Sequence, residues 1–350
     1  MKFELSEDQA LLRQSTRDFL TSEWPVERAR KVMEHEPRGY EPSDWQRLAE
    51  MGYLGLILPA NVGGQGLGAI ELAIVLEEAG RACMPGPYLD AVLAAAVLAV
   101  AGGHDALLQE INVGTQLVTL AREDAAFRGT KVTPTRFDGG RARGTKYFIP
   151  FAAQADALIV ATPETLCLVS KPFDVVAMQT IDPAQRFGEV GFDHAATAVG
   201  PTSLLEHTDR LAAIGASAML LGVMSRVLEM TLEYVQTRQA FKRPIGSFQA
   251  LQHRLADMLL KTESTRSAVY RAAWCVDTND AAAPLACAAA KAYAGDAARL
   301  VCGESIQMHG GIGFTWELDL HFYFKRAKTL EQFYGSTEAQ LEQALAAAGF

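Results

Sequence analysis

Cysteine is scarce in this chain of 350 residues, and no two cysteines are spaced as a pair. The five are far apart and odd in number, and they include no Cys-x-x-Cys motif: Cys83, Cys167, Cys275, Cys287 and Cys302. A disulfide framework is therefore not expected. The seven histidines are equally dispersed. None shows the i, i+4 spacing that places two metal ligands on one helix face, so no metal site is predicted.

An excess of basic residues is also lacking. The chain carries 32 lysines and arginines against 41 aspartates and glutamates, and its net charge is -9. This balance argues against nucleic acid as a partner. The longest apolar stretch, residues 91–103, is too short to cross a membrane. The first residues are acidic where a signal peptide would be basic and then apolar, so we expect a cytoplasmic protein with no membrane association.

Helical periodicity marks the first part of the chain. Apolar residues recur at intervals of three to four, as in Leu11, Leu12, Phe19 and Leu20. Another helix is expected to begin at Pro42, and a glycine-rich loop over residues 62–68 precedes one at residues 71–79. Residues 1–111 are therefore predicted to form an N-terminal helical domain.

The pattern changes to short apolar runs between residues 112 and 202. Turn clusters separate these runs, which include residues 117–120, 157–160 and 166–169. The segment predicts an antiparallel β domain. Because no helix of useful length lies between the runs, a parallel crossover topology is disfavoured.

Long helices return over residues 203–350. One apolar stripe at helical spacing comprises Leu220, Val223, Val227, Met230 and Tyr234. A later helix is expected from about Pro284 to Met308 and another from about Trp316 to Glu331, separated by a glycine-rich turn. The predicted fold class is mainly α with a central β domain, in the order helical domain, β domain and helical bundle.

Three segments resemble one known family. Residues 234–258, which read YVQTRQAFKRPIGSFQALQHRLADM, closely resemble the acyl-CoA dehydrogenase signature. Residues 307–314, QMHGGIGF, match a second motif of that family, and residues 50–55, EMGYLG, match its N-terminal domain. The resemblance covers nearly the whole chain. It implies an acyl-CoA dehydrogenase-like fold with a C-terminal four-helix bundle that drives oligomerisation.

An arginine on a loop after a long helix is a good ligand for a pyrophosphate, because its guanidinium is always charged and can donate two hydrogen bonds. Arg238 occupies such a position. The resemblance implies that Phe241 and Gln249 lie near the adenosine part of FAD, and that Gln307 and the backbone of Gly310 and Gly311 approach its ADP moiety. In the family these groups contact an FAD held mainly by a neighbouring subunit, so an oligomer is implied.

The usual catalytic base is missing. In the family a glutamate removes the α proton of an acyl-CoA, and the matching segment near the C-terminus has Tyr334 in its place. Other members carry the glutamate on the long helix, where this chain has Ala212. A tyrosine, with a pKa of about 10, is a poor base at neutral pH. The catalytic residue is therefore unknown.

Three nearby carboxylates are candidates for a relocated base: Asp209, Glu331 and Glu338. Each is disfavoured, because proton transfer tolerates little displacement of the base and exposed carboxylates are common on such helices. The charges at Arg326, Lys328 and Glu331 are interpreted as a solvated helix face.

The β domain also departs from the family. Residues 120–126 read LAREDAA where the family usually has a Thr-Glu-Pro-like segment that ends in Gly-Ser-Asp. Residues 144–150 still resemble the strand beside the flavin ring, with Phe148 and Pro150 where an aromatic and a hydroxyl residue are common. Pro150 has no backbone N–H to donate. The resemblance therefore gives no basis for expecting flavin contacts from residues 120–126.

The leading hypothesis is the non-catalytic subunit of a heterotetrameric acyl-CoA dehydrogenase, of the kind that degrades steroid side chains in bacteria. The chain would complete the FAD site of a related catalytic subunit, with an acyl-CoA as substrate and electron-transferring flavoprotein as acceptor. One alternative is a self-sufficient homotetramer with a relocated base. The other is a flavin oxidase or monooxygenase on the same fold.

Overall fold

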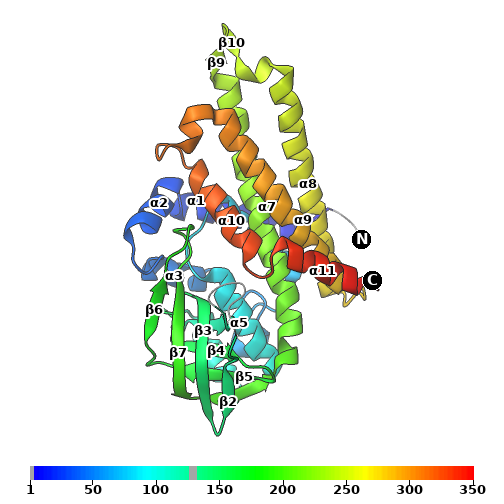
Figure 1. Cartoon of the computed structure of the whole chain (residues 1–350). Coiled ribbons are helices and arrows are strands. Elements are labelled where there is room, and N and C mark those ends of the chain that lie inside the picture. The colour runs from blue at the N-terminus through cyan, green and yellow to red at the C-terminus, as the bar shows by residue number, and fades with distance from the viewer. Residues whose placement is uncertain (1–3, 126–131) are drawn as a thin grey trace. The chain divides into compact units, whose positions relative to one another are not determined.

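The structure is a computed structural model that describes residues 4–125 and 132–350. The described residues form two compact units. The helical unit comprises the residues up to Arg30 together with Ala69–Met84 and Arg210–Phe350, and the mixed unit comprises Lys31–Gly68 and Pro85–Asp209. The predicted order of helices, strands and helices is confirmed (Figure 1). The boundaries at residues 111 and 202 stay a prediction.

Seven helices and a small hairpin make up most of the described helical unit. They are α1 (Glu7–Glu23), α4 (Ala69–Arg81), α7 (Leu205–Thr237), β9 (Gln239–Ala240), β10 (Arg243–Pro244), α8 (Gln249–Asp277), α9 (Ala283–His309), α10 (Leu320–Gln332) and α11 (Thr337–Ala347). The short 3-10 helices η3 (Ile245–Ser247) and η4 (Gly310–Phe314) follow the hairpin and α9. Both α7 and α2 (Val26–His35) run across the boundary between the units.

Local sequence signals account for several helix ends. The Ser6 hydroxyl accepts from the Gln9 backbone N–H at 3.2 Å, and the Gln9 side chain accepts from the Ser6 N–H at 3.0 Å, which is the reciprocal capping box that starts α1. α9 has a proline in its first turn and is followed by its C-cap residue Gly310, whose φ of 64° is a conformation that glycine adopts at little cost. The predicted bounds of α9 are confirmed to within one residue.

Small residues let the helices of this unit approach closely. α9 packs against α8, α10 and α11. A Cβ at Gly295 of α9 would lie 2.7 Å from Thr337 Oγ1 of α11. A Cβ at Gly222 of α7 would lie 1.9 Å from the Glu77 carbonyl oxygen of α4, and Gly80 of α4 meets the α7 backbone at Met219 in the same way. The α4–α7 crossing therefore requires glycine on both helices.

The mixed unit holds two four-stranded sheets and several helices. Its helices are α3 (Pro42–Glu50), α5 (Tyr88–Ala101), α6 (Asp105–Asn112) and the 3-10 helices η1 (Ala60–Val62) and η2 (Thr202–Leu204). One sheet has the order β1-β4-β5-β8 and the other β2-β3-β7-β6. The strands are β1 (Val118–Ala121), β2 (Arg136–Asp138), β3 (Arg141–Pro150), β4 (Ala157–Ala161), β5 (Thr165–Ser170), β6 (Val175–Met178), β7 (Phe187–Ala195) and β8 (Thr197–Pro201).

One strand pair corrects the prediction of a wholly antiparallel domain. β1 and β4 are parallel, with Val118 opposite Ala157, whereas the other named pairs in both sheets are antiparallel. A parallel pair needs a crossover connection, and the sequence offered no helix for one. The chain between β1 and β4 instead passes through β2 and β3 of the other sheet.

Helix α7 is apolar enough to be mistaken for a membrane span. By length and composition alone, Thr202–Thr237 could cross a membrane, and it is the one such helix among residues 4–125 and 132–350. However, 94% of its most apolar window is buried inside the molecule, as in the core helix of a soluble protein.

Candidate cofactor-binding surface

Arg238 is the first residue after α7. Its backbone N–H donates to the Tyr234 carbonyl at 2.8 Å, and its own carbonyl accepts from the Ile245 N–H at 2.8 Å, so the main chain is fixed on both sides. The side chain is exposed. Within residues 4–125 and 132–350, no carboxylate forms an ion pair with Arg238. The guanidinium is therefore available to an external anion.

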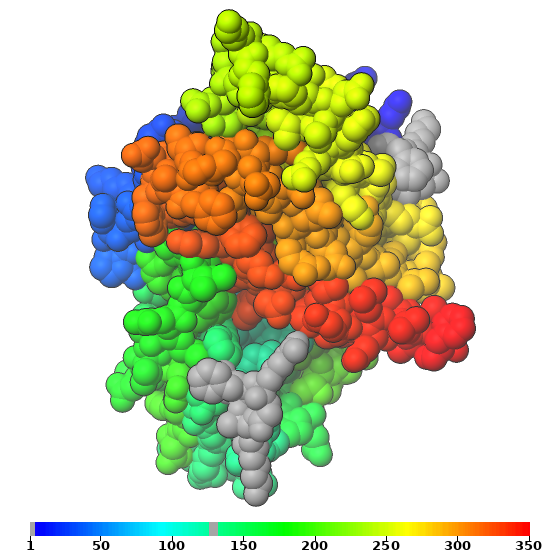
Figure 2. Space-filling model, turned by 45° about the horizontal axis from the view of Figure 1, so that its top comes forward, coloured from blue at the N-terminus to red at the C-terminus, as the bar shows by residue number. Residues whose placement is uncertain are grey.

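Phe241 occupies the tip of the hairpin that follows. β9 and β10 pair antiparallel with Ala240 opposite Arg243, which leaves Phe241 and Lys242 as a two-residue turn. Both have positive φ, 52° and 66°, as a type I′ turn requires, although neither is glycine. The Phe241 side chain is 89% exposed, and its ring meets Phe248 edge-on at 6.1 Å. A strained turn thus presents an aromatic ring to solvent, and Figure 2 shows this yellow-green segment protruding.

Gly310 and Gly311 form an open turn at the end of α9. A Cβ built on either glycine would have no atom within 4 Å. Gln307, one turn earlier, is exposed. A ligand could therefore approach this backbone closely, although the Gly310 N–H itself already donates to the Gln307 carbonyl.

The ends of α7 and α9 are held side by side. The Tyr234 and His309 rings stack with centroids 4.3 Å apart, and Arg238 and Gly310 follow them in sequence. Gln249 begins α8 after the hairpin and is exposed. Two of the six predicted residues are joined directly, because the Gly310 backbone N–H donates to the Gln307 carbonyl at the end of α9. The arrangement combines an uncompensated cation, an exposed ring, two amide side chains and an open glycine turn, a donor set that suits the ADP half of FAD.

The segment with Tyr334 has a well-defined geometry but no carboxylate at that position. Tyr334 has a φ of 61°, and Gly335 follows with 96°. The buried Lys291 amine donates to the carbonyls of Glu331 at 3.1 Å and Gly335 at 2.8 Å. These two hydrogen bonds fix the backbone on both sides of Tyr334. Burial lowers the pKa of Lys291 to about 8. Sequence reasoning did not identify this lysine.

The candidate bases are engaged in ion pairs or are not supported by the geometry. The Asp209 carboxylate lies 2.5 Å from the Arg122 guanidinium. Glu331 is buried and accepts from the Lys328 amine at 2.5 Å. The interpretation of Arg326 and Glu331 as a solvated face is wrong, because they are 0% and 5% exposed and belong to the core around α10. Glu338 is exposed on α11.

The strand that resembles the family's flavin-flanking segment uses its backbone donors internally. The Tyr147 N–H donates to Glu123 O at 2.8 Å and the Phe148 N–H to the Met178 sulfur at 3.2 Å. The Phe151 N–H donates to Arg186 O at 2.8 Å, and Pro150 has none. Few donors along residues 147–151 are left to meet a flavin ring.

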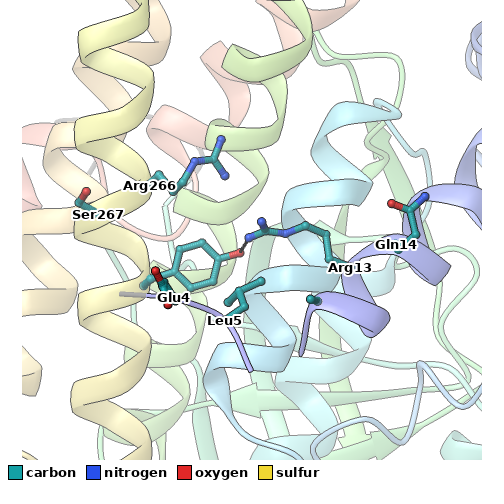
Figure 3. Close-up of a pocket in the computed structure, with 8 residues that line it drawn as sticks. Glu4, Leu5, Arg13, Gln14, Arg266 and Ser267 are labelled. Carbon is teal, nitrogen blue, oxygen red and sulfur yellow. Dashed lines mark hydrogen bonds between the residues drawn. The ribbon is translucent and has the colours of Figure 1, made fainter. Parts of the chain in front are cut away.

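A separate pocket of about 420 Å³ lies between the N-terminal segment and α8 (Figure 3). Arg13, Arg266 and Tyr270 line it, and all three also contact Glu77, which is 2% exposed. The Tyr270 hydroxyl donates to the Glu77 carboxylate at 2.8 Å. Because Glu77 offsets the guanidinium charge, we interpret this cluster as a buried polar joint between α1, α4 and α8. The described residues include no group of three or more potential metal ligands.

Comparison with known proteins identifies the class of protein that this fold and surface represent. Residues 210–349 match the "Acyl-CoA dehydrogenase, C-terminal domain" and residues 6–109 the "Acyl-CoA dehydrogenase, N-terminal domain". The chain is 33% identical over 340 residues to "Acyl-CoA dehydrogenase IpdE2" of Mycolicibacterium smegmatis, covering 97% of this chain and 98% of that protein. The chain belongs to the acyl-CoA dehydrogenase family.

Two similar solved structures are each named after two components. A chain of the ChsE4-ChsE5 complex from Mycobacterium tuberculosis has a TM-score of 0.89 at 28% identity, covering 100% of this chain and 99% of that one. A chain of the Tcur3481-Tcur3483 steroid ACAD has a TM-score of 0.89 at 29% identity and 98% coverage of each chain. The predicted acyl-CoA dehydrogenase-like fold is therefore confirmed.

Proposed function

We propose that this chain is a subunit of an FAD-dependent acyl-CoA dehydrogenase that oxidises an acyl-CoA to a 2-enoyl-CoA. Its role is to complete the FAD site of a related partner subunit. Arg238 binds the pyrophosphate, Phe241 and Gln249 contact the adenosine part, and Gln307 and the Gly310–Gly311 backbone meet the ADP moiety. The observation that carries the proposal is the exposed, uncompensated Arg238 beside an 89% exposed Phe241.

Those features are costly for an isolated chain. Burying a phenylalanine side chain contributes about 1.5 to 3 kcal/mol, which Phe241 forgoes while it stays in water. Each non-glycine residue held at positive φ costs on the order of 1 kcal/mol more. Contact with a cofactor and a partner would recover the free energy of burying the Phe241 side chain. A guanidinium that forms no ion pair with a carboxylate is available to pair with phosphate.

The chain's own flavin contacts point the same way. The backbone donors at Tyr147, Phe148 and Phe151 are consumed within the mixed unit, and Pro150 has none. FAD supplies the hydride acceptor of the reaction when bound. This chain's residues hold one end of it and contribute no identified base, because Tyr334 stands where the family has glutamate. The proton is therefore removed by the partner.

The relatives suggest the substrate and the assembly. One similar structure is named a steroid ACAD and the other a complex of two named components. We infer a heterotetramer with a related subunit, and a bulky steroid-type acyl-CoA as substrate. Electron-transferring flavoprotein is the expected acceptor. A homotetramer with Asp209 as base gains no support, because that carboxylate is paired with Arg122.

The test is the ratio of flavin to protein in two preparations. In one the chain is purified alone, and in the other it is co-expressed with an acyl-CoA dehydrogenase paralogue encoded beside it. We expect almost no flavin in the first, and flavin with acyl-CoA oxidation in the co-purified complex. One flavin per chain in the isolated protein would contradict the proposal and favour a self-sufficient enzyme or an oxidase.

A further inference from the structure

Two pairs of side chains join α7 to α9 just before the proposed FAD contacts. The first pair is Thr231 and Ser305, whose hydroxyl oxygens are 2.6 Å apart and fully buried. Thr231 already donates its single hydroxyl hydrogen to Val227 O at 2.7 Å. It can therefore only accept from Ser305, and the direction of this bond is fixed.

The second pair, Tyr234 and His309, lies about one turn further along each helix. The two rings are nearly parallel, at 25°, with centroids 4.3 Å apart. The Tyr234 hydroxyl also donates to the His309 carbonyl at 3.3 Å. That carbonyl is at the end of α9, where it has no partner within the helix.

The His309 ring is fixed as well as stacked. It is 4% exposed, and its Nδ1 lies 2.8 Å from Ser305 O. A carbonyl oxygen can only accept, so Nδ1 carries the proton. Burial lowers the pKa of His309, which keeps the imidazole neutral near pH 7 and limits it to this one tautomer.

We infer that Tyr234 and His309 are positioning residues that fix the separation between Arg238 and the Gly310–Gly311 turn. Each of the two rings is connected closely to one of the proposed FAD contacts. Arg238 N–H bonds directly to Tyr234 O at 2.8 Å, and Gly310 is covalently joined to His309. The inference rests on the proposed function, because positioning matters only if both groups hold one FAD. Hydrogen bonds need donor–acceptor distances of about 2.7 to 3.2 Å, so a displacement of about 1 Å between two groups that bind one ligand breaks a bond to one of them.

The test uses the purified two-subunit complex, stripped of flavin and titrated with FAD. Tyr234→Leu and His309→Leu remove the ring stack, and we expect each to raise the FAD dissociation constant about tenfold or more. Tyr234→Phe keeps the stack and loses only the hydroxyl bond, so about threefold is expected. The conservative variant should thus recover most of the affinity.

A control separates positioning from general stability. Val269→Ala also opens the buried core of the helical unit, but on α8 and about 30 Å along the helix axis from Gln249. It should lower the melting temperature and leave the FAD dissociation constant within twofold of wild type. A leucine variant that binds FAD within twofold of wild type, or a Val269→Ala variant that loses FAD equally, overturns the inference.

Two further measurements keep the outcomes distinct. If the leucine variants do not fold, Tyr234→Phe decides alone, and an unchanged dissociation constant overturns the inference. Arg238→Ala in the same complex tests the proposed function itself. Loss of FAD in Arg238→Ala without loss in the Tyr234 and His309 variants would refute only the positioning role, whereas unchanged binding in Arg238→Ala would refute the shared site.

Discussion

The sharpest prediction concerns Gly311, where the effects on stability and on cofactor binding have opposite signs. Its φ lies outside the left-handed region, and a Cβ there would have no atom within 4 Å. Gly311→Ala therefore fits the folded chain without strain. Because alanine has fewer unfolded conformations to lose, the variant should be more stable by about 0.4 to 1 kcal/mol.

FAD binding should weaken in the same variant. If the cofactor approaches this backbone as proposed, a methyl group would occupy its position and break a hydrogen bond to a charged phosphate. Such a bond contributes about 1.5 to 3 kcal/mol, which corresponds to roughly a tenfold to hundredfold rise in the FAD dissociation constant. The general fold offers no reason for such a loss.

The assay is FAD titration of the stripped two-subunit complex, combined with thermal unfolding of the same samples. Gly191→Ala is the matched control, because Gly191 lies on β7 with the same open surroundings and no positive φ. It should leave FAD binding unchanged. A Gly311→Ala complex that binds FAD as tightly as wild type would refute the close approach of the cofactor to this turn.

Three further outcomes follow from other sites. Arg238→Lys keeps the charge but not the two-pronged donor geometry, so FAD titration should give about tenfold weaker binding, with Arg238→Ala weaker still. Gly222→Ala places a methyl carbon 1.9 Å from Glu77 O and should destabilise the chain by about 3 kcal/mol in urea unfolding. Burial lowers the pKa of Lys291 from 10.5 to about 8. Between these two pH values the unfolded chain therefore carries a proton on Lys291 that the folded chain lacks. The free energy of unfolding of wild type, relative to that of Lys291→Met, should therefore rise with pH above about 8, by up to about 1.4 kcal/mol per pH unit. A difference between the two proteins that does not change with pH would contradict this.

Periodicity predicted the elements well where one face of a helix is apolar and the ends carry turn residues. α9 is an example, since Pro284 and Gly310 mark its ends and its bounds were predicted to within one residue. Helix α10 was predicted to begin at about Trp316 but begins at Leu320. The intervening residues read WELD, and the N-cap is Asp319, whose side chain makes no capping hydrogen bond. Periodicity alone could not locate the start, because Trp316 and Leu318 continue the apolar pattern ahead of the helix.

Buried charge was the feature that sequence reasoning missed. Arg326 and Glu331 look like surface residues by type, because arginine and glutamate are rarely fully buried. Their burial depends on partners distant in sequence, such as Met84 O for Arg326 at 3.2 Å. A signal did exist at Glu77 and Glu78, two adjacent acids that follow the apolar run Leu72–Leu76 in α4, which is the pattern expected of buried acids with ion-pair partners.

The candidate site was predicted residue by residue from family resemblance, whereas the contacts that support it were not. Tyr234 and His309 lie within the matched segments, but nothing in a linear sequence says that their rings stack. The two residues are 75 positions apart in the sequence, and the packing of α7 against α9 brings them into contact. Supporting contacts of this kind depend on tertiary structure.

The proposed division of the FAD site between two subunits has a thermodynamic consequence. If this chain holds only one end of an FAD and its partner the other, the cofactor binds the assembled pair far more tightly than either chain. By linkage, FAD must then stabilise the assembly, by about 2.7 kcal/mol at a free concentration one hundred times its dissociation constant. Under the proposed function, the exposed Phe241 and Arg238 would be tolerable in a subunit that works only in the complex, because both would gain their partners in the same step as the cofactor.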